Sequence, residues 1–229
     1  MDHTAVAERF IAERFPRATI AVIAGSTARG DRTATSDIDL LLIGEGLFDG
    51  SAQSEASTHA FGGEIFEVFA YTPEGFREWA ERGIQGHRPV IVHMLVDGIA
   101  IREDDRLDEL RAHWSAVLAE GPRLSTAEAL HRRYVITDVL DDYRDATDAL
   151  ELRVLSSVLF ERTAELMLLT AGRWIGAGKW LPRRLRALSA DRAEALSGPF
   201  IAGDHAAFAE RVEDELRRAG GRVQAGHVR

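Results

Sequence analysis

The sequence predicts an α+β protein in which a small mixed sheet is followed by an all-helical bundle. Short apolar runs rich in β-branched residues indicate buried strands in the first half of the chain. Gly121-Pro122 is the best boundary, because only helical spacing follows it. We therefore expect two domains, residues 1–121 with the sheet and residues 122–229 with the helices.

The first half opens with helical spacing over residues 4–15, and Pro16 ends this segment. Residues 45–62 are rich in Gly, Ser and Ala, which favours a loop or a poorly regular crossing. The three buried strands are expected over residues 20–24, 38–43 and 65–71.

A second helix begins after the third strand. Thr72 is a suitable N-cap and Pro73 suits the first helical position, so we expect a helix to about Arg82. Residues 89–96 fit a helix and a strand equally well. A short edge strand over residues 98–102 and a helix over residues 105–118 complete this domain.

The second half shows helical patterns only. Ser125 and Glu128 form a capping box, which predicts a helix that runs to about Thr147. Three more helices are expected over residues 150–170, 182–188 and 205–218. We expect the tail after Gly220 to be disordered.

Composition limits the possible classes of protein. The 229 residues include 45% hydrophobic residues and no Cys, so a core is possible but disulfides and thiolate metal sites are not. We see no signal peptide and no apolar run of about 18 residues, and we expect a cytoplasmic protein without a membrane span. The net charge of −9 disfavours binding of long nucleic acid, although metal ions could still neutralise a bound nucleotide triphosphate.

Two carboxylates stand at the start of the second expected strand. Asp37 and Asp39 are at positions i and i+2, so they project from the same face, with backbones about 7 Å apart. Such close carboxylates repel each other unless a cation lies between them, and oxygen ligands favour Mg²⁺ or Mn²⁺. The preceding turn, Gly25-Ser26, lets backbone N–H groups approach a phosphate closely.

This arrangement resembles the nucleotidyltransferase superfamily, which includes DNA polymerase beta. The shared signature is a Gly-Ser turn, a gap of about ten residues, and then Asp-x-Asp on a strand. The layout is closest to the kanamycin and other aminoglycoside nucleotidyltransferases, whose form of the motif also matches at Arg29 and Ser36. The resemblance implies that Asp37 and Asp39 are catalytic metal ligands, and that the residues that hold the donor's phosphates are Gly25, Ser26, Arg29 and Ser36.

The family has a third carboxylate on a neighbouring strand, and two residues are candidates here. Glu67 lies within an apolar strand, where an unpaired carboxylate is costly, so a shared metal would explain it. Glu64 lies where that strand begins, and exposure to solvent would explain it. We favour Glu67 as the third catalytic ligand and keep Glu64 as the alternative.

Two candidates lie in the helical half. Asp142, followed by Tyr143, resembles the segment of kanamycin nucleotidyltransferase that carries its general base. That enzyme has a phosphate-binding Lys four residues later, where this chain has Ala146. Lys179, the only lysine among 28 basic residues, could replace that Lys. A solvated helix face and an ordinary surface lysine are the alternatives.

The expected function is transfer of a nucleoside monophosphate, AMP from ATP, to a hydroxyl group. The expected acceptor is a small hydroxylated molecule, and the expected cofactor is Mg²⁺ or Mn²⁺. Two alternatives remain open: an enzyme that adenylylates a protein, and a non-catalytic nucleotide-binding module.

Overall fold

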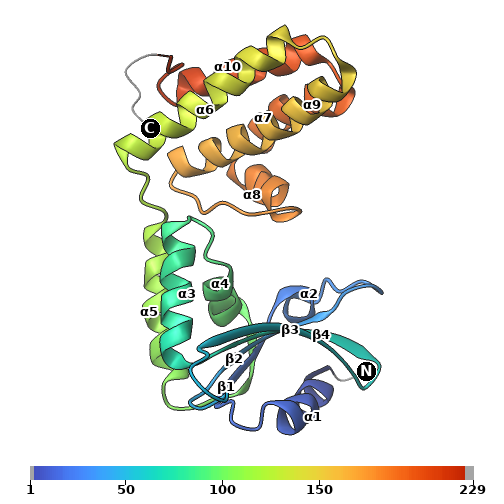
Figure 1. The fold of residues 1–229 in the computed structure, drawn as a ribbon, viewed down its shortest axis with the longest axis vertical. Coiled ribbons are helices and arrows are strands. Elements are labelled where there is room, and N and C mark those ends of the chain that lie inside the picture. Colours follow the sequence, from blue (N-terminus) through green and yellow to red (C-terminus); the bar gives the residue numbers. More distant parts are fainter. Residues whose placement is uncertain (1–2, 225–229) are drawn as a thin grey trace. The chain divides into compact units, whose positions relative to one another are not determined.

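The computed structural model describes residues 3–224. The chain divides into two compact units, Met1–Glu120 and Gly121–Arg229, and Figure 1 shows that all strands belong to the first. The first unit is a mixed sheet with helices and the second is entirely helical, so the predicted α+β fold class is confirmed.

The sheet of the first unit has five strands in the order β3-β4-β2-β1-β5. The central strands β2 and β4 run parallel, and the other neighbouring pairs are antiparallel. Parallel pairing of β2 and β4 places the starts of both strands at the same edge of the sheet. The strand bounds are Ile20–Ile23 for β1, Ile38–Ile43 for β2, Ser54–Phe61 for β3, Glu64–Tyr71 for β4 and Ile99–Arg102 for β5.

Helices cover both faces of this sheet (Figure 1). On one face, Phe10 of α1 stacks on Phe66 of β4 with the ring centroids 4.5 Å apart. On the other face, Phe76 of α3 packs against Tyr71 and Trp114. The helix bounds are His3–Arg14 for α1, Gly25–Arg29 for α2, Pro73–Gln85 for α3, Val90–Asp97 for α4 and Leu107–Glu120 for α5.

One strand of this unit was not predicted. The expected loop over residues 45–62 contains β3, which pairs with β4 along its whole length, from Ser54 opposite Tyr71 to Phe61 opposite Glu64. The strand lies at the edge of the sheet, and its small and polar residues lack the apolar signal of a buried strand. The ambiguous segment 89–96 is a helix, because Val92 and Leu95 of α4 are buried in the core.

The second unit packs five helices around one apolar core. Ser125 accepts a hydrogen bond from the Glu128 amide at 3.1 Å, as the capping box predicts. Helix α9 was not predicted, and it contains Gly198 and Pro199, two residues that weaken a helical pattern. The bounds are Thr126–Asp145 for α6, Ala149–Thr170 for α7, Trp180–Leu188 for α8, Ala190–Ala202 for α9 and His205–Arg218 for α10.

The tail was expected to be disordered after Gly220, and residues 221–224 differ from this expectation. Arg222 forms ion pairs with Asp141 and Glu213, and the Val223 amide donates to Thr137 Oγ1 at 3.2 Å. These contacts hold the segment against α6 and α10. The rest of the tail lies outside the described residues.

A membrane-spanning helix needs about 20 apolar residues. Within residues 3–224, every helix is too short or too polar to cross a bilayer.

Candidate active site

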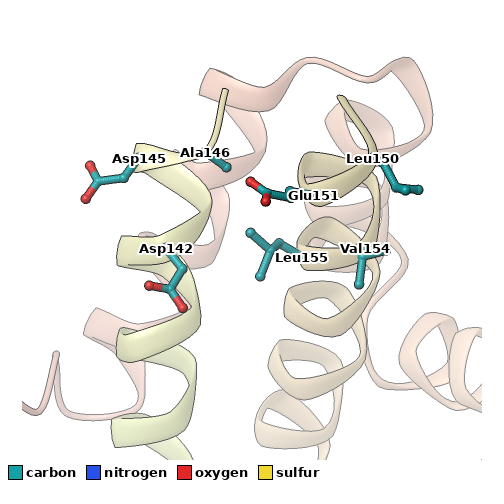
Figure 2. A pocket seen from close by; sticks show the side chains of 7 residues that line it. All are labelled: Asp142, Asp145, Ala146, Leu150, Glu151, Val154 and Leu155. Carbon is teal, nitrogen blue, oxygen red and sulfur yellow. The ribbon is translucent and has the colours of Figure 1, made fainter. Parts of the chain in front are cut away.

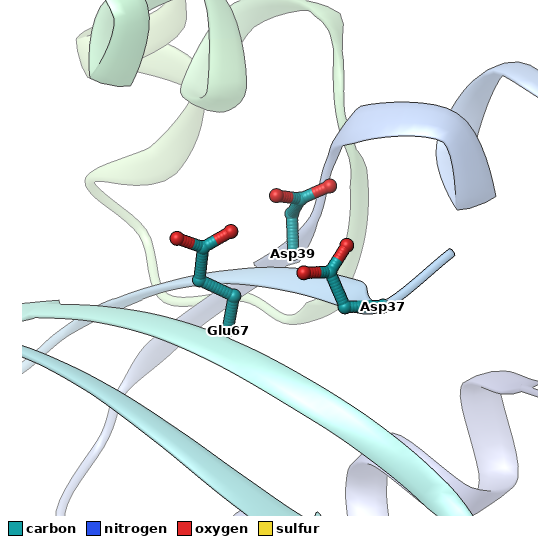
Figure 3. Close-up of side chains that lie close together, drawn as sticks. All are labelled: Asp37, Asp39 and Glu67. Atoms are coloured by element: carbon teal, nitrogen blue, oxygen red, sulfur yellow. The ribbon is translucent and has the colours of Figure 1, made fainter. Parts of the chain in front are cut away.

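Three carboxylates converge at the edge of the sheet where β2 and β4 begin. Asp39 on β2 is directly opposite Glu67 on β4, and Asp37 lies two residues before Asp39, so it projects from the same face. One oxygen atom from each side chain lies within 4.8 Å of the other two (Figure 3). The structure thus brings together the three residues that the sequence suggested as metal ligands, and their role stays a prediction.

The electrostatics of this group favour a bound cation. Burial raises the pKa of Glu67 above its ordinary value, and the negative charges of Asp39 and Asp37 raise that pKa further. A hydrogen bond shared with Asp39 acts in the same direction. The three carboxylates therefore cannot all ionise cheaply unless positive charge is supplied between them.

Position 25 must be a glycine because it lies very close to Asp39. The residue has a φ of +61°, and a Cβ atom placed on it would lie 1.7 Å from Asp39 Oδ2. The neighbouring Ala24 amide donates to the Asp39 carbonyl oxygen at 2.9 Å. Only glycine lets the turn after β1 pass directly against this carboxylate.

The other predicted phosphate-binding residues lie on α2 and the loop that follows it. Ser26 is in the first turn of α2, and its carbonyl oxygen accepts from the Asp31 amide at 3.1 Å. Arg29 forms an ion pair with Asp31 at 3.3 Å. Ser36 Oγ accepts from the Thr33 amide at 2.9 Å, so this hydroxyl shapes the loop before Asp37. Nothing in these contacts identifies a phosphate site.

The solvent-exposure explanation for Glu64 is wrong. The side chain is 13% exposed, its carboxylate forms an ion pair with Arg32, and Glu64 Oε1 lies 3.4 Å from His3 Nδ1. The hydrogen bond from Arg32 lowers the pKa of Glu64 below its ordinary value. Because residues three apart on a strand face opposite ways, Glu64 and Glu67 lie on opposite faces, and the geometry favours Glu67 as the third ligand.

Sequence reasoning did not single out Arg32. It lies in the irregular segment between α2 and β2, where neither periodicity nor a motif marks it. The only available signal was an arginine five residues before Asp37, inside the very segment that carries the motif. Arg32 draws notice only in the structure, where it contacts Glu64, a residue 32 positions away.

Asp142 lies on the exposed side of α6. It borders a cavity of about 560 Å³ between α6 and α7 (Figure 2). The adjacent Tyr143 is buried, and its hydroxyl lies 2.7 Å from His205 Nδ1, so this tyrosine serves the helical core. The residues lining the cavity are Asp142, Asp145, Ala146, Leu150, Glu151, Val154 and Leu155.

Lys179 directly precedes α8 in an exposed turn. Gly178 before it has a φ of +50°, and Trp180 after it is partly exposed, with the Arg183 guanidinium 5.1 Å from the Trp180 ring centroid. Lys179 and Asp142 both belong to the helical unit, so the group of three carboxylates is complete without either.

Comparison with known proteins agrees with this geometry. The family of nucleotidyltransferase domains matches residues 6–145, which include all three carboxylates and extend to the end of α6. The chain therefore belongs to the nucleotidyltransferase domain family, and the predicted superfamily and enzyme class are confirmed.

Among solved structures, the chain is similar to a nucleotidyltransferase-like protein from Exiguobacterium sibiricum. The two are 14% identical, and the alignment covers 94% of this chain and 74% of the other, with a TM-score of 0.48. No curated protein matches the chain.

Proposed function

We propose that this enzyme transfers a nucleoside monophosphate, AMP from ATP, to a hydroxyl group of a small acceptor in a metal-dependent reaction. The convergence of Asp37, Asp39 and Glu67 on one face of the sheet is the observation that carries the proposal. The family itself implies a nucleotide triphosphate as one substrate.

The chemistry of the three side chains fits a divalent cation. All the donor atoms are carboxylate oxygens, the ligand type that suits Mg²⁺ and Mn²⁺. Burial raises the pKa of Glu67 and the charges of Asp39 and Asp37 raise it further, so a cation at this position would favour the ionised form. Bound Mg²⁺ or Mn²⁺ would lower the pKa of the acceptor hydroxyl and neutralise charge on the departing pyrophosphate.

The chain's own residues would supply the geometry for this chemistry. In the proposal, Asp37 and Asp39 would hold the divalent metal, and Glu67 would complete its set of carboxylate ligands. The close approach at Gly25 places the first turn of α2 beside these carboxylates. Ser26 and Arg29, together with Ser36, would bind the phosphates of the donor.

The cavity beside Asp142 is our candidate for recognising the acceptor. Asp142, Asp145 and Glu151 are among the residues that line this cavity. Figure 2 shows the carboxylates of Asp142 and Glu151 toward the space between the two helices, with Leu155 beside them, while that of Asp145 points away. Two carboxylates and an apolar wall suit a hydroxylated molecule that bears amino groups. An aminoglycoside-like acceptor, implied by the resemblance, has this chemistry, and Asp142 would act as its general base.

A protein acceptor is the second candidate. Leu150 is 71% exposed and Val154 is 54% exposed at the rim of the cavity, and exposed apolar side chains that lie together often mark a protein contact. A small-molecule acceptor and a protein acceptor would use the same carboxylates, so only the acceptor assay separates the two.

The decisive experiment is binding of Mn²⁺ and ATP by calorimetry. We expect wild-type protein to bind Mn²⁺–ATP, and Asp39→Ala to lose that binding, because it removes a central ligand. Asp49→Ala is the matched control, since Asp49 is fully exposed and forms a surface ion pair with Arg17. Equal affinity in Asp39→Ala and wild-type protein would exclude this site.

If binding is confirmed, release of pyrophosphate would be followed with a panel of acceptors. Dependence of that release on an amino-bearing, hydroxylated small molecule would support the first candidate. Labelling of a protein with adenylate would favour the second, and binding without any turnover would favour a non-catalytic module.

A further inference from the structure

Arg32 connects the loop before β2 to strand β4. Its Nη2 atom donates to the carbonyl oxygen of Ser36 at 2.8 Å and also to the Glu64 carboxylate. Ser36 directly precedes Asp37, and Glu64 begins the strand that carries Glu67. A single guanidinium group therefore links the backbone next to one proposed metal ligand to the strand that carries another.

The link is shielded from solvent. The side chain of Arg32 is 19% exposed and that of Glu64 is 13% exposed. The hydrogen bond to Glu64 raises the pKa of Arg32, and the negative charge of Asp37 contributes to the same shift. A charged pair in this setting is screened less than a surface pair and keeps a more definite geometry.

Helix α1 contributes a third member to this network. His3 Nδ1 lies 2.9 Å from Arg32 Nη1 and 3.4 Å from the Glu64 carboxylate. The network lies on the face of the sheet opposite to Glu67, because Glu64 and Glu67 alternate along β4. Arg32 therefore does not take part in the group of three carboxylates itself.

We propose that Arg32, held by Glu64, is a positioning residue that fixes Asp37 relative to Glu67 and so sets the geometry for metal binding. This inference rests on the proposed function. Without the Arg32 contacts, the Ser36 carbonyl loses its tie to β4. Asp37, which precedes the first paired residue Ile38, can then shift more easily relative to the strand that carries Glu67. Displacements of about 1 Å are enough to impair such a site.

Arg102 is a matched control for a purely structural role. It is 20% exposed, donates to Glu8 of α1 at 2.8 Å and donates to the Ala18 carbonyl oxygen at 3.3 Å. Arg102 therefore makes the same two kinds of contact as Arg32, a carboxylate and a backbone carbonyl. It lies on the edge strand β5, which does not carry any of the three carboxylates.

The experiment compares Arg32→Met, Arg32→Lys and Arg102→Met. Mn²⁺ affinity would be measured by electron paramagnetic resonance of the free ion, and hydrogen exchange of the amides of residues 30–37 would be measured without metal. We expect Arg32→Met to weaken Mn²⁺ binding about tenfold, or about 1.4 kcal/mol, and to speed exchange in this loop. Arg32→Lys should recover part of both losses, because it retains the charge.

We expect Arg102→Met to lower the Tm about as much as Arg32→Met while leaving Mn²⁺ affinity and the exchange of residues 30–37 unchanged. The inference is overturned if Arg32→Met changes only the Tm, or if both variants weaken Mn²⁺ binding equally. Absence of Mn²⁺ binding by wild-type protein would instead contradict the proposed function. In that case, unchanged loop exchange in metal-free Arg32→Met would overturn the positioning role separately.

Discussion

The candidate residues of the two units differ in how the fold holds them. In the sheet unit, strand pairing sets Asp39 opposite Glu67, and Gly25 packs against Asp39. In the helical unit, Asp142 and Lys179 are exposed on a helix surface and in a turn. Strand pairing thus fixes Asp39 and Glu67 before any ligand binds, while the candidates of the second unit must be ordered largely by their ligand.

The largest effect that we expect from this contrast is a loss of turnover when Glu67 is changed. Glu67→Gln removes a charged metal ligand at nearly constant volume, so we expect turnover to fall about 1000-fold, or about 4 kcal/mol in the activation free energy. Pyrophosphate release with an acceptor that supports turnover would measure the loss. Glu55→Gln is the control, since Glu55 is exposed on β3 and should retain full activity. A loss below tenfold in Glu67→Gln would argue against a role as metal ligand.

A second test addresses the close approach at Gly25. In Gly25→Ala, the new methyl group would meet Asp39 Oδ2 at 1.7 Å, so the carboxylate or the turn must shift. We expect turnover to fall by about two orders of magnitude, as misplacement of about 1 Å can cause.

Gly30→Ala separates this steric effect from backbone strain. Gly30 also has a positive φ, +73°, but its added Cβ would meet nothing within 4 Å in the described structure. We expect this variant to lose about 1 kcal/mol of stability and to keep most of its activity. If Gly25→Ala and Gly30→Ala lose equal activity, backbone strain rather than contact with Asp39 explains the loss.

The sheet unit was also the easier one to predict from sequence. Its buried strands are apolar runs, and the spacing from Gly25 to Asp39 is a local pattern that can be recognised in the sequence alone. The edge strand β3 was not predicted, because its side chains are largely exposed and its pairing with β4 is a contact between separate segments. The contact between Arg32 and Glu64 was not predicted for the same reason, since 32 positions separate the two partners.

The helices of the second unit were mostly predictable, but their chemistry was not. Periodicity reveals the buried face of a helix such as α7, because burial repeats with the helical turn. It gives no information about which exposed residue meets a ligand. Asp142 therefore came from a resemblance, and the cavity beside it is a product of how α6 and α7 pack.

A third test sharpens the contrast at Asp142. If this carboxylate is the general base, Asp142→Asn should lower turnover about 100-fold, the lower range for such a group. Asp145→Asn is the matched control, because Asp145 borders the same cavity one turn further along α6. Equal, small losses in both variants would identify a generally acidic surface that attracts the acceptor.

The fourth test concerns Lys179, where a smaller effect is expected. A cation near the leaving pyrophosphate stabilises developing charge, but an exposed side chain in a turn does so weakly. We expect Lys179→Ala to lower turnover about tenfold and Lys179→Arg to lie between it and wild type. Arg186→Ala controls for the general charge of α8, because Arg186 is exposed on that helix. If both alanine variants retain full activity, an arginine must serve instead, with Arg29 the first candidate.

The smallest expected effect is a gain in stability from removing the Glu67 charge. Because the pKa of Glu67 in the fold is raised above its ordinary value of 4.5, the fold favours the protonated form. Stability is therefore lost as the pH rises from below 4.5 through the raised pKa, and it stays reduced at neutral pH. Glutamine has no charge to lose or gain over this range.

In the presence of a chelator at pH 7.5, we therefore expect the Tm of Glu67→Gln to exceed that of wild type by about 2 °C. The difference should vanish near pH 4, where wild-type Glu67 is also protonated. Added Mn²⁺ and ATP should reverse the order, because ligand binding stabilises only the protein that retains the site. A lower Tm for Glu67→Gln at pH 7.5 without metal would mean that the carboxylate is satisfied by the fold itself. Glu67 would then contribute to the stability of the strand pairing rather than to metal binding. The contrast drawn between the two units would no longer apply.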